Sequence, residues 1–161
     1  MVETMEAGMA HLATIFERNK GPKLADMSCA GAAGGCGAGV VAFLNGRLLS
    51  GSDALLDLMN FSALAADADL IVTGEGMVDD QTAGGKFVSA VAARANGTPV
   101  VVLAGGIAEG TNLEALYEKG VTAVMPVTSR PMTLGEAMSS GAEGVRLTAT
   151  QLFRLAGALK A

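Results

Sequence analysis

The chain has 161 residues, of which half are apolar and only 4% aromatic, so its core must be built from Ala, Val, Leu, Ile and Met. The formal net charge is −5 and there is no basic stripe, which argues against nucleic acid as a partner. No apolar run approaches the ~20 residues that span a bilayer, and no signal-peptide pattern is present, so a cytoplasmic protein without a membrane partner is expected.

The first part of the chain predicts helices around a glycine-rich tract. Apolar residues at helical spacing predict an amphipathic helix over residues 2–19. A tract of small residues over 28–39 follows, and Asn45-Gly46 is typical of a turn. Short helices are predicted over residues 54–59 and from Ser62.

From residue 70 the pattern changes to a regular alternation of strands and helices, which predicts a parallel sheet with helical crossovers. Three strands make a thin parallel sheet, because such sheets need both faces covered and usually more strands. The sequence therefore predicts an incomplete α/β unit that is joined, near residue 68, to part of another structural unit. The predicted strands are 70–72, 99–103 and 122–127, and the helices are 86–96, 112–119 and a last one opened by a Thr133–Glu136 capping box.

Polar side chains are concentrated after the first predicted strand, where open α/β sheets bind ligands. The strand closes with Thr73-Gly74-Glu75-Gly76, and the polar residues after it are Asp79, Asp80, Gln81, Thr82 and Lys86. Mg²⁺ takes one or two carboxylates plus substrate oxygens, and a Lys supplies a point charge for a phosphoryl group. The loop predicts a Mg²⁺–phosphate site; the alternative is a solvated loop in which Lys86 is an ordinary first-turn residue.

The glycine tract over residues 31–39 has two interpretations. Its successive backbone N–H groups could cradle a phosphate, or its small residues could let a helix pack closely against a neighbour. The P-loop fingerprint does not fit, because Asp80 stands where it needs Gly and Phe87 where it needs Ser or Thr. Arg130, which follows the third strand, could hold a carboxylate or phosphate bidentately at the same edge as Glu75.

Several segments keep the order and spacing of one known family. They are Thr73-Gly74-Glu75-Gly76-Met77-Val78-Asp79-Asp80-Gln81-Thr82, Gly84-Gly85-Lys86, the small-residue tract over 31–38, the strand over 100–105, and the ending Val124-Met125-Pro126 with Pro131-Met132-Thr133-Leu134. Together they resemble the glycerate kinase family, which phosphorylates D-glycerate with ATP. The resemblance covers nearly the whole chain.

The chain also departs from the family pattern. Met77 stands where the family usually carries a basic residue, and Phe87 follows Lys86 where a small residue is common. Family members are considerably longer, with an α/β domain interrupted by a second domain. The resemblance therefore implies that residues 1–68 are part of the inserted second domain. Residues 69–161 would be the returning half of a Rossmann-like domain, which would explain the thin sheet.

The resemblance implies ATP and Mg²⁺ as cofactors, D-glycerate as substrate, and a role for each motif residue. Lys86 would contact a phosphoryl group or the glycerate carboxylate. Glu75 or Asp79 would hold Mg²⁺ or orient the glycerate hydroxyl. The residues expected to contact phosphate or substrate are Gly34, Gly35, Gly37, Gly74, Gln81, Thr82 and Arg130.

A second hypothesis belongs to a different class of protein. Under it, these residues form a non-catalytic fragment or remnant that binds a small anion or packs as a structural unit. Its N-terminal helix and glycine tract would expose apolar surface for a partner. A second copy of the chain and a missing N-terminal portion both stay open as partners, and so does phosphorylation at either the 2- or the 3-hydroxyl of glycerate.

Overall fold

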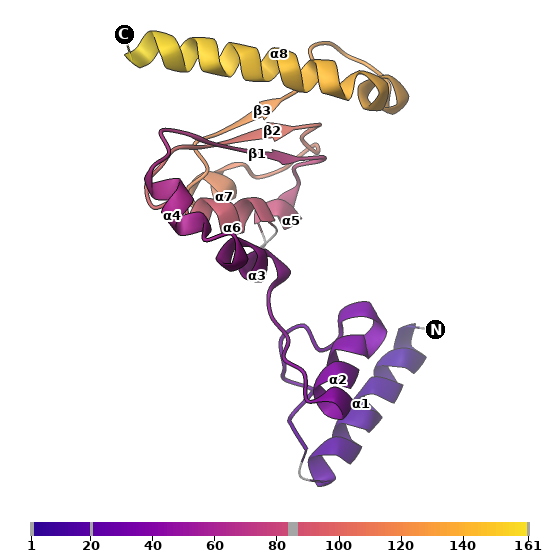
Figure 1. Ribbon diagram of the computed structural model, residues 1–161. Helices are drawn as coiled ribbons and strands as arrows, with labels where there is room; N and C mark the ends of the chain where they lie inside the picture. Colours follow the sequence, from indigo (N-terminus) through magenta and orange to yellow (C-terminus); the bar gives the residue numbers. More distant parts are fainter. Residues whose placement is uncertain (1, 20, 84–86, 161) are drawn as a thin grey trace. The chain divides into compact units, whose positions relative to one another are not determined.

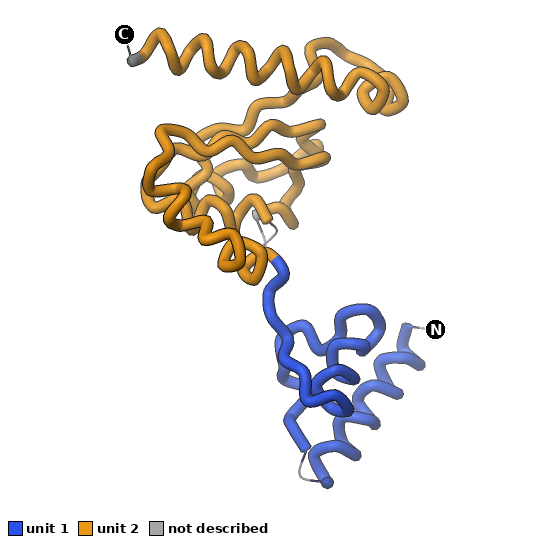
Figure 2. Tube along the Cα trace, in the orientation of Figure 1, with its two compact units in different colours: residues 1–51 blue, residues 52–161 orange. Residues whose placement is uncertain are grey.

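The chain folds into two compact units, as Figure 2 shows. The computed structural model describes residues 2–19, 21–83 and 87–160. The N-terminal unit is Met1–Gly51 and the C-terminal unit is Ser52–Ala161. None of the helices in the described residues is both long enough and apolar enough to cross a membrane.

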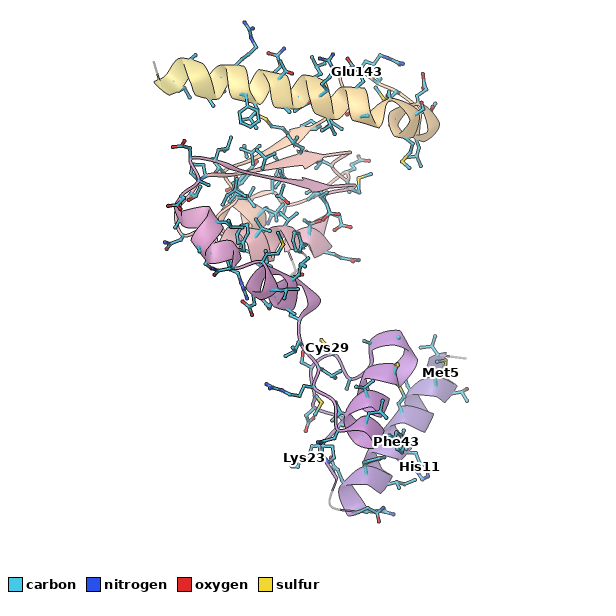
Figure 3. All side chains as sticks on the ribbon, viewed as in Figure 1. Met5, His11, Lys23, Cys29, Phe43 and Glu143 are labelled. Atoms are coloured by element: carbon cyan, nitrogen blue, oxygen red, sulfur yellow. The ribbon has the colours of Figure 1, made fainter. Side chains whose placement is uncertain are left out.

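The N-terminal unit is a pair of helices, α1 (Val2–Arg18) and α2 (Ala32–Leu44). The predicted first helix is thus confirmed. The helices are joined by an edge-to-face contact of Phe16 with Phe43, which is labelled in Figure 3, at a ring-centroid distance of 5.1 Å. Asn45 ends α2 in the left-handed region, at φ 50°, so the turn predicted here is present.

Two short helices, α3 (Gly51–Leu58) and α4 (Phe61–Ala66), begin the C-terminal unit. Leu56 of α3 is 1% exposed and packs in a cluster with Val91 and Val100. Arg94 also joins α3, through ion pairs to two aspartates. Exposed ion pairs contribute less than about 1 kcal/mol, whereas burying a Leu contributes about 1.5–3 kcal/mol. Apolar packing therefore does most to hold α3 on this unit.

The C-terminal unit is built on a three-stranded parallel sheet, as predicted. Its strands are β1 (Ile71–Glu75), β2 (Val100–Ala104) and β3 (Ala123–Pro126), in the order β1-β2-β3. The central strand, β2, is buried along its whole length, because its neighbours cover both edges and helices cover both faces.

Helices lie on both faces of the sheet, as Figure 1 shows. One face carries α5 (Asp80–Ala83), α6 (Phe87–Ala93) and α7 (Glu114–Tyr117), and α8 (Leu134–Lys160) crosses the other. Val102 of β2 is in the core cluster with Leu116 of α7, whereas Val101 and Leu103 pack with Leu152 of α8. Figure 3 shows the side chains that fill these two layers. The pleat of β2 therefore sends alternate residues to opposite faces.

The helix boundaries show which local sequence signals were sufficient to predict where a helix begins or ends. The capping box that opens α8 is confirmed: Thr133 donates its N–H to Glu136 Oε2 at 2.8 Å, and Glu136 donates its N–H to Thr133 Oγ1 at 3.3 Å. The helix predicted over 112–119 is shorter, with only Glu114–Tyr117 helical. The short helix α5 was not predicted.

Candidate active site

The loops that follow β1 and β2 approach each other closely. Gly105 donates its N–H to the Glu75 carbonyl at 2.9 Å, and Val78 donates to the Gly106 carbonyl at 3.0 Å. A Cβ on Gly105 would lie 2.4 Å from the Gly76 carbonyl oxygen, so only glycine fits without a backbone shift. Val78 also bridges to Ile107, which extends the pairing of the two segments past the strand ends.

We expect Gly105→Ala to lower the free energy of unfolding by about 1–3 kcal/mol, because the added methyl group meets backbone that must move. Urea unfolding followed by circular dichroism measures this change. Gly157→Ala on α8 is the matched control, since nothing lies within 4 Å of a Cβ there. It should be neutral or stabilising by up to about 1 kcal/mol. Equal effects of the two substitutions would show that the close approach is unimportant.

Glu75 is the last residue of β1 and lies at the carboxyl end of the sheet. It is in register with Ala104, which belongs to the core cluster beneath α6 and α7. Neighbours in register on parallel strands point to the same face, so Glu75 is on the face that carries α5. Its side chain is half-buried, and it makes no hydrogen bond or ion pair with the part of the chain that the structure describes.

Asp79 and Thr82 close the loop with a reciprocal set of hydrogen bonds. Asp79 donates its N–H to Thr82 Oγ1 at 3.1 Å. Its carboxylate oxygen Oδ1 accepts the Thr82 N–H at 3.0 Å and the Thr82 hydroxyl at 3.2 Å. The pattern is that of a capping box, with Asp79 as the cap and α5 as the helix. These two residues therefore shape the turn directly, whatever else they contact.

The turn is anchored on its buried side by Ser89, which the sequence analysis did not single out. Thr82 is fully buried, and its carbonyl accepts the Ser89 hydroxyl at 2.7 Å. Asp80 accepts the Asn112 N–H at 3.1 Å and so ties this loop to the one after β2. The available signal for Ser89 was one hydroxyl on the otherwise apolar buried face of a helix. Such a group needs a hydrogen-bond partner.

The structure describes only some of the remaining candidate residues of this loop. Gly74 lies in β1 and Gln81 is exposed on α5. Lys86, the predicted phosphate contact, lies outside the described residues, as do Gly84 and Gly85. Within the described part of the chain, the structure thus brings the Glu75, Asp79 and Thr82 positions to one end of β1.

Arg130 lies after β3 and contacts the start of α8. Its Nη2 group is 3.2 Å from Glu136 Oε1, and its Nη1 group donates to the Pro131 carbonyl at 3.1 Å. It lines a hollow of about 130 Å³ whose lining does not include Glu75. Its expected role as an anion ligand stays a prediction, and in this structure it supports the capping box.

Hydrogen bonds from the Thr133 backbone and hydroxyl, and then from Arg130, lower the pKa of Glu136 below its ordinary value of 4.5. A carboxyl group with a lowered folded-state pKa stabilises the fold above its unfolded pKa, and this stability is lost as pH falls through the folded value. We therefore expect Glu136→Gln to be less stable than wild type at pH 7, with the difference vanishing in strong acid. Thermal unfolding from pH 7 to pH 3 measures this; a constant difference would contradict it.

An apolar cleft of about 370 Å³ opens on the α8 side of the sheet. Glycines at the ends of β1 and β2 and the start of α8 line it. The apolar side chains that line it are Met77, Leu103, Val127, Met132, Leu134, Met138 and Val145. Gly74 and Glu75, two of the predicted site residues, also line it. The cleft itself was not predicted, because most of its other residues come from separate elements and look like ordinary core positions in the sequence.

The glycine tract forms a left-handed turn in the N-terminal unit. Ala33, Gly34 and Gly35 have φ values of 51°, 67° and 89°. Gly35 is against Met9 of α1, and a Cβ on Gly37 would lie 2.5 Å from the Cys29 carbonyl oxygen. Close packing thus accounts for glycine at positions 35 and 37, while the expected contacts of Gly34, Gly35 and Gly37 with phosphate stay predictions.

Comparison with known proteins decides the family. A sequence model described as the glycerate kinase family matches residues 1–157. The chain belongs to the glycerate kinase family. The resemblance carried by the motifs at Thr73–Thr82 is therefore confirmed.

Named relatives extend this result. The chain is 40% identical over 142 residues to glycerate kinase of Halalkalibacterium halodurans, covering 87% of the chain and 37% of the relative. It is 30% identical over 147 residues to glycerate 2-kinase of Escherichia coli K12, covering 90% and 38%. A solved structure from Salmonella typhimurium LT2, assigned as glycerate kinase 2, matches with a TM-score of 0.69 and 33% identity over 94% of the chain and 38% of that structure. The chain thus spans about two-fifths of the length of these glycerate kinases, and the α/β fold is confirmed.

Proposed function

We propose that this chain is part of a kinase that transfers the γ-phosphoryl group of ATP to a hydroxyl of D-glycerate. The observation that carries the proposal is the polar turn at the carboxyl end of β1, with Glu75 beside the Asp79–Thr82 capping box, in a chain of the glycerate kinase family. Such a turn lies where parallel sheets bind phosphorylated ligands. The proposal includes a cytoplasmic location.

The donor set suits a Mg²⁺ ion that is held mainly by phosphate oxygens. No three metal-ligating side chains gather among residues 2–19, 21–83 and 87–160, so an all-protein cage is not built there. Mg²⁺ commonly takes only one or two carboxylates and completes its shell with water and phosphate. The Glu75 carboxylate, which has no partner among those residues, fits this need, and Asp79 is the second candidate. When bound, the ion would neutralise charge on the transferred phosphoryl group.

Phosphoryl transfer needs positioning and charge neutralisation more than covalent chemistry. In this proposal Lys86 contacts the phosphoryl group or the glycerate carboxylate, and Glu75 or Asp79 orients the glycerate hydroxyl. The capping hydrogen bonds keep the turn in one conformation, so that its groups need little reorganisation as the reaction proceeds. In this proposal Gly74, Gln81, Thr82 and Arg130 supply supporting contacts to the phosphates or the substrate, and the glycine tract offers backbone N–H groups to phosphate.

The proposed domain division has residues 1–68 as part of an inserted domain and 69–161 as the returning half of a Rossmann-like domain. Leu56 of α3 packs in a cluster with Val91 of α6, which supports a close association of α3 with the α/β part. The short segment before β1 would thus act as a connector that lies on the α/β domain. The alternative function is a non-catalytic fragment that binds a small anion or packs as a structural unit. The exposed apolar side chains of α1 favour it, among them Val2, Met5 and Ile15.

Release of ADP in the presence of D-glycerate tests the function. The protein that carries these residues should release ADP with D-glycerate and not with glycerol, which lacks the carboxylate. ADP release that does not depend on D-glycerate would contradict the proposal. Protein that is monomeric and binds no ATP would favour the non-catalytic fragment instead.

A further inference from the structure

A buried hydroxyl on α6 contacts the turn that carries Asp79. Ser89 is 6% exposed, and its neighbours along α6, Val88 and Val91, belong to two different core clusters. The Ser89 hydroxyl donates to the Thr82 carbonyl at 2.7 Å. Because close packing holds α6 on both sides of Ser89, this hydroxyl is a donor in a fixed position.

The Thr82 carbonyl needs a donor from outside its own helix. Thr82 is fully buried and lies in α5, which has only four residues. The last four carbonyls of a helix have no partner within the helix, so every carbonyl of α5 depends on other groups. A buried carbonyl that loses its donor is costly, since water cannot replace the missing bond. Ser89 therefore fixes where the end of α5 lies against α6.

Thr82 in turn holds the Asp79 side chain. The Thr82 N–H donates to Asp79 Oδ1 at 3.0 Å, and the Thr82 hydroxyl donates to the same oxygen at 3.2 Å. Two bonds from one residue to one carboxylate oxygen restrict both the position and the rotation of the carboxyl group. A shift of Thr82 would therefore move the Asp79 carboxylate with it.

The loop has a second tie, which contributes less. Asp80 accepts the Asn112 N–H at 3.1 Å, but this bond is exposed. Water can take the place of either partner there, so losing the bond costs little. The buried bond from Ser89 therefore does more to hold Thr82, and through it Asp79, than this exposed bond does.

We propose that Ser89 is a positioning residue for phosphoryl transfer: through Thr82 it holds the Asp79 carboxylate where that group meets Mg²⁺ or the glycerate hydroxyl. The inference rests on the proposed function, in which Asp79 has one of these two roles. Ser89 is buried, so it acts on the reaction through the residues that it holds. Losing a residue that holds a ligand in place commonly costs about 10–100-fold in metal affinity or activity.

Steady-state kinetics of the protein that carries residues 1–161 measures this role. We expect Ser89→Ala to lower kcat for glycerate phosphorylation about 10–100-fold and to leave the KM for ATP within about twofold of wild type. Ser139→Ala is the matched control, because Ser139 is an exposed serine that donates to a carbonyl of its own helix, α8. Val91→Ala is a second control, which shortens a buried side chain of α6 and removes no hydrogen bond. Both should keep kcat within about twofold, because neither touches the loop.

A double-mutant cycle with Asp79→Asn tests whether Ser89 acts through Asp79. Asn keeps the shape of the side chain and an oxygen that can accept from Thr82, but it lacks the charge. Adding Ser89→Ala to Asp79→Asn should lower kcat by less than about a further twofold, because the group that Ser89 holds no longer works. If Ser89→Ala lowers kcat equally in both backgrounds, Ser89 acts independently of Asp79 and the proposal is wrong.

Amide hydrogen exchange of Thr82 gives a readout that does not depend on activity. Since this N–H donates to Asp79 Oδ1, we expect Ser89→Ala to raise its exchange rate at least about tenfold, and Ser139→Ala and Val91→Ala to change it less than about twofold. Circular dichroism checks that each variant is folded.

Unchanged Thr82 exchange or unchanged kcat in Ser89→Ala would overturn the positioning role. Equal losses of kcat in Ser89→Ala and Val91→Ala would also overturn it, because they would reflect a general loosening of α6. Wild-type protein that forms no phosphoglycerate would overturn the proposed function, and the role of Ser89 in catalysis with it. The exchange rates would still decide, in that case, whether Ser89 holds the turn at Asp79.

Discussion

Glu75→Gln should lower kcat/KM for glycerate phosphorylation by about a hundredfold or more, because it removes a charge from the end of β1 while keeping the side-chain shape. Removing one preorganised electrostatic contact typically costs about 10²–10³ in rate. Glu75 is half-buried, on the face that carries α5, and has no partner among the described residues, so its carboxylate has no evident structural duty. A steady-state assay of the protein that carries this chain measures the effect.

A matched control separates a local role from a general effect of charge. Glu118→Gln removes the same charge from an exposed position just after α7 that is not among the predicted site residues. It should leave kcat/KM within about twofold of wild type. Comparable losses in both variants, or wild-type kinetics in Glu75→Gln with unchanged folding, would remove Glu75 from the site.

Leu116→Ala should lower the free energy of unfolding by about 2–5 kcal/mol. Leu116 is fully buried on α7, in the cluster that also holds Val88, Val102 and Val121. This cluster joins α6 and α7 to the sheet, and truncation would leave a cavity where three elements meet. Because α7 has only four residues, neighbouring backbone hydrogen bonds cannot hold it in place once the Leu is shortened.

Urea unfolding of the C-terminal unit measures this loss of stability. Leu58→Ala is the control, because Leu58 is 84% exposed and its truncation should change stability by less than about 0.5 kcal/mol. A loss below about 1 kcal/mol for Leu116→Ala would show that α7 contributes little to the core. Such a result would also mean that α7 does little to hold the hydrogen bond between Asn112 and Asp80 in place.

Local patterns were sufficient for much of the fold. Alternation of short apolar strands with helices predicted the parallel sheet, and the Thr133–Glu136 spacing predicted where α8 begins, because these features depend on neighbouring residues. The helix α5 was missed because four residues give no measurable periodicity. The spacing of Asp79 and Thr82 also fits a helix cap, but these residues were interpreted only as contacts to metal or substrate.

The sequence predicted that the candidate loop lies at the end of β1, but it did not predict the contacts that hold this loop in place. Glu75 ends β1 and Asp79 follows it along the chain, so sequence order alone placed them at one end of the sheet. The anchoring by Ser89 and the close approach at Gly105 join segments that are distant in sequence, and no local pattern encodes such pairs. The ion pair between Arg130 and Glu136 likewise depends on how the chain turns into α8.

The most direct test of the account follows phosphoglycerate itself. Phosphorus NMR of ATP and D-glycerate, incubated with the protein that carries residues 1–161, is recorded for wild type, Lys86→Ala and the exposed control Lys119→Ala. The account predicts phosphoglycerate and ADP in equal amounts from wild type and Lys119→Ala, and a rate at least about a hundredfold lower from Lys86→Ala. ATP turnover without phosphoglycerate, or an unchanged rate in Lys86→Ala, would contradict it.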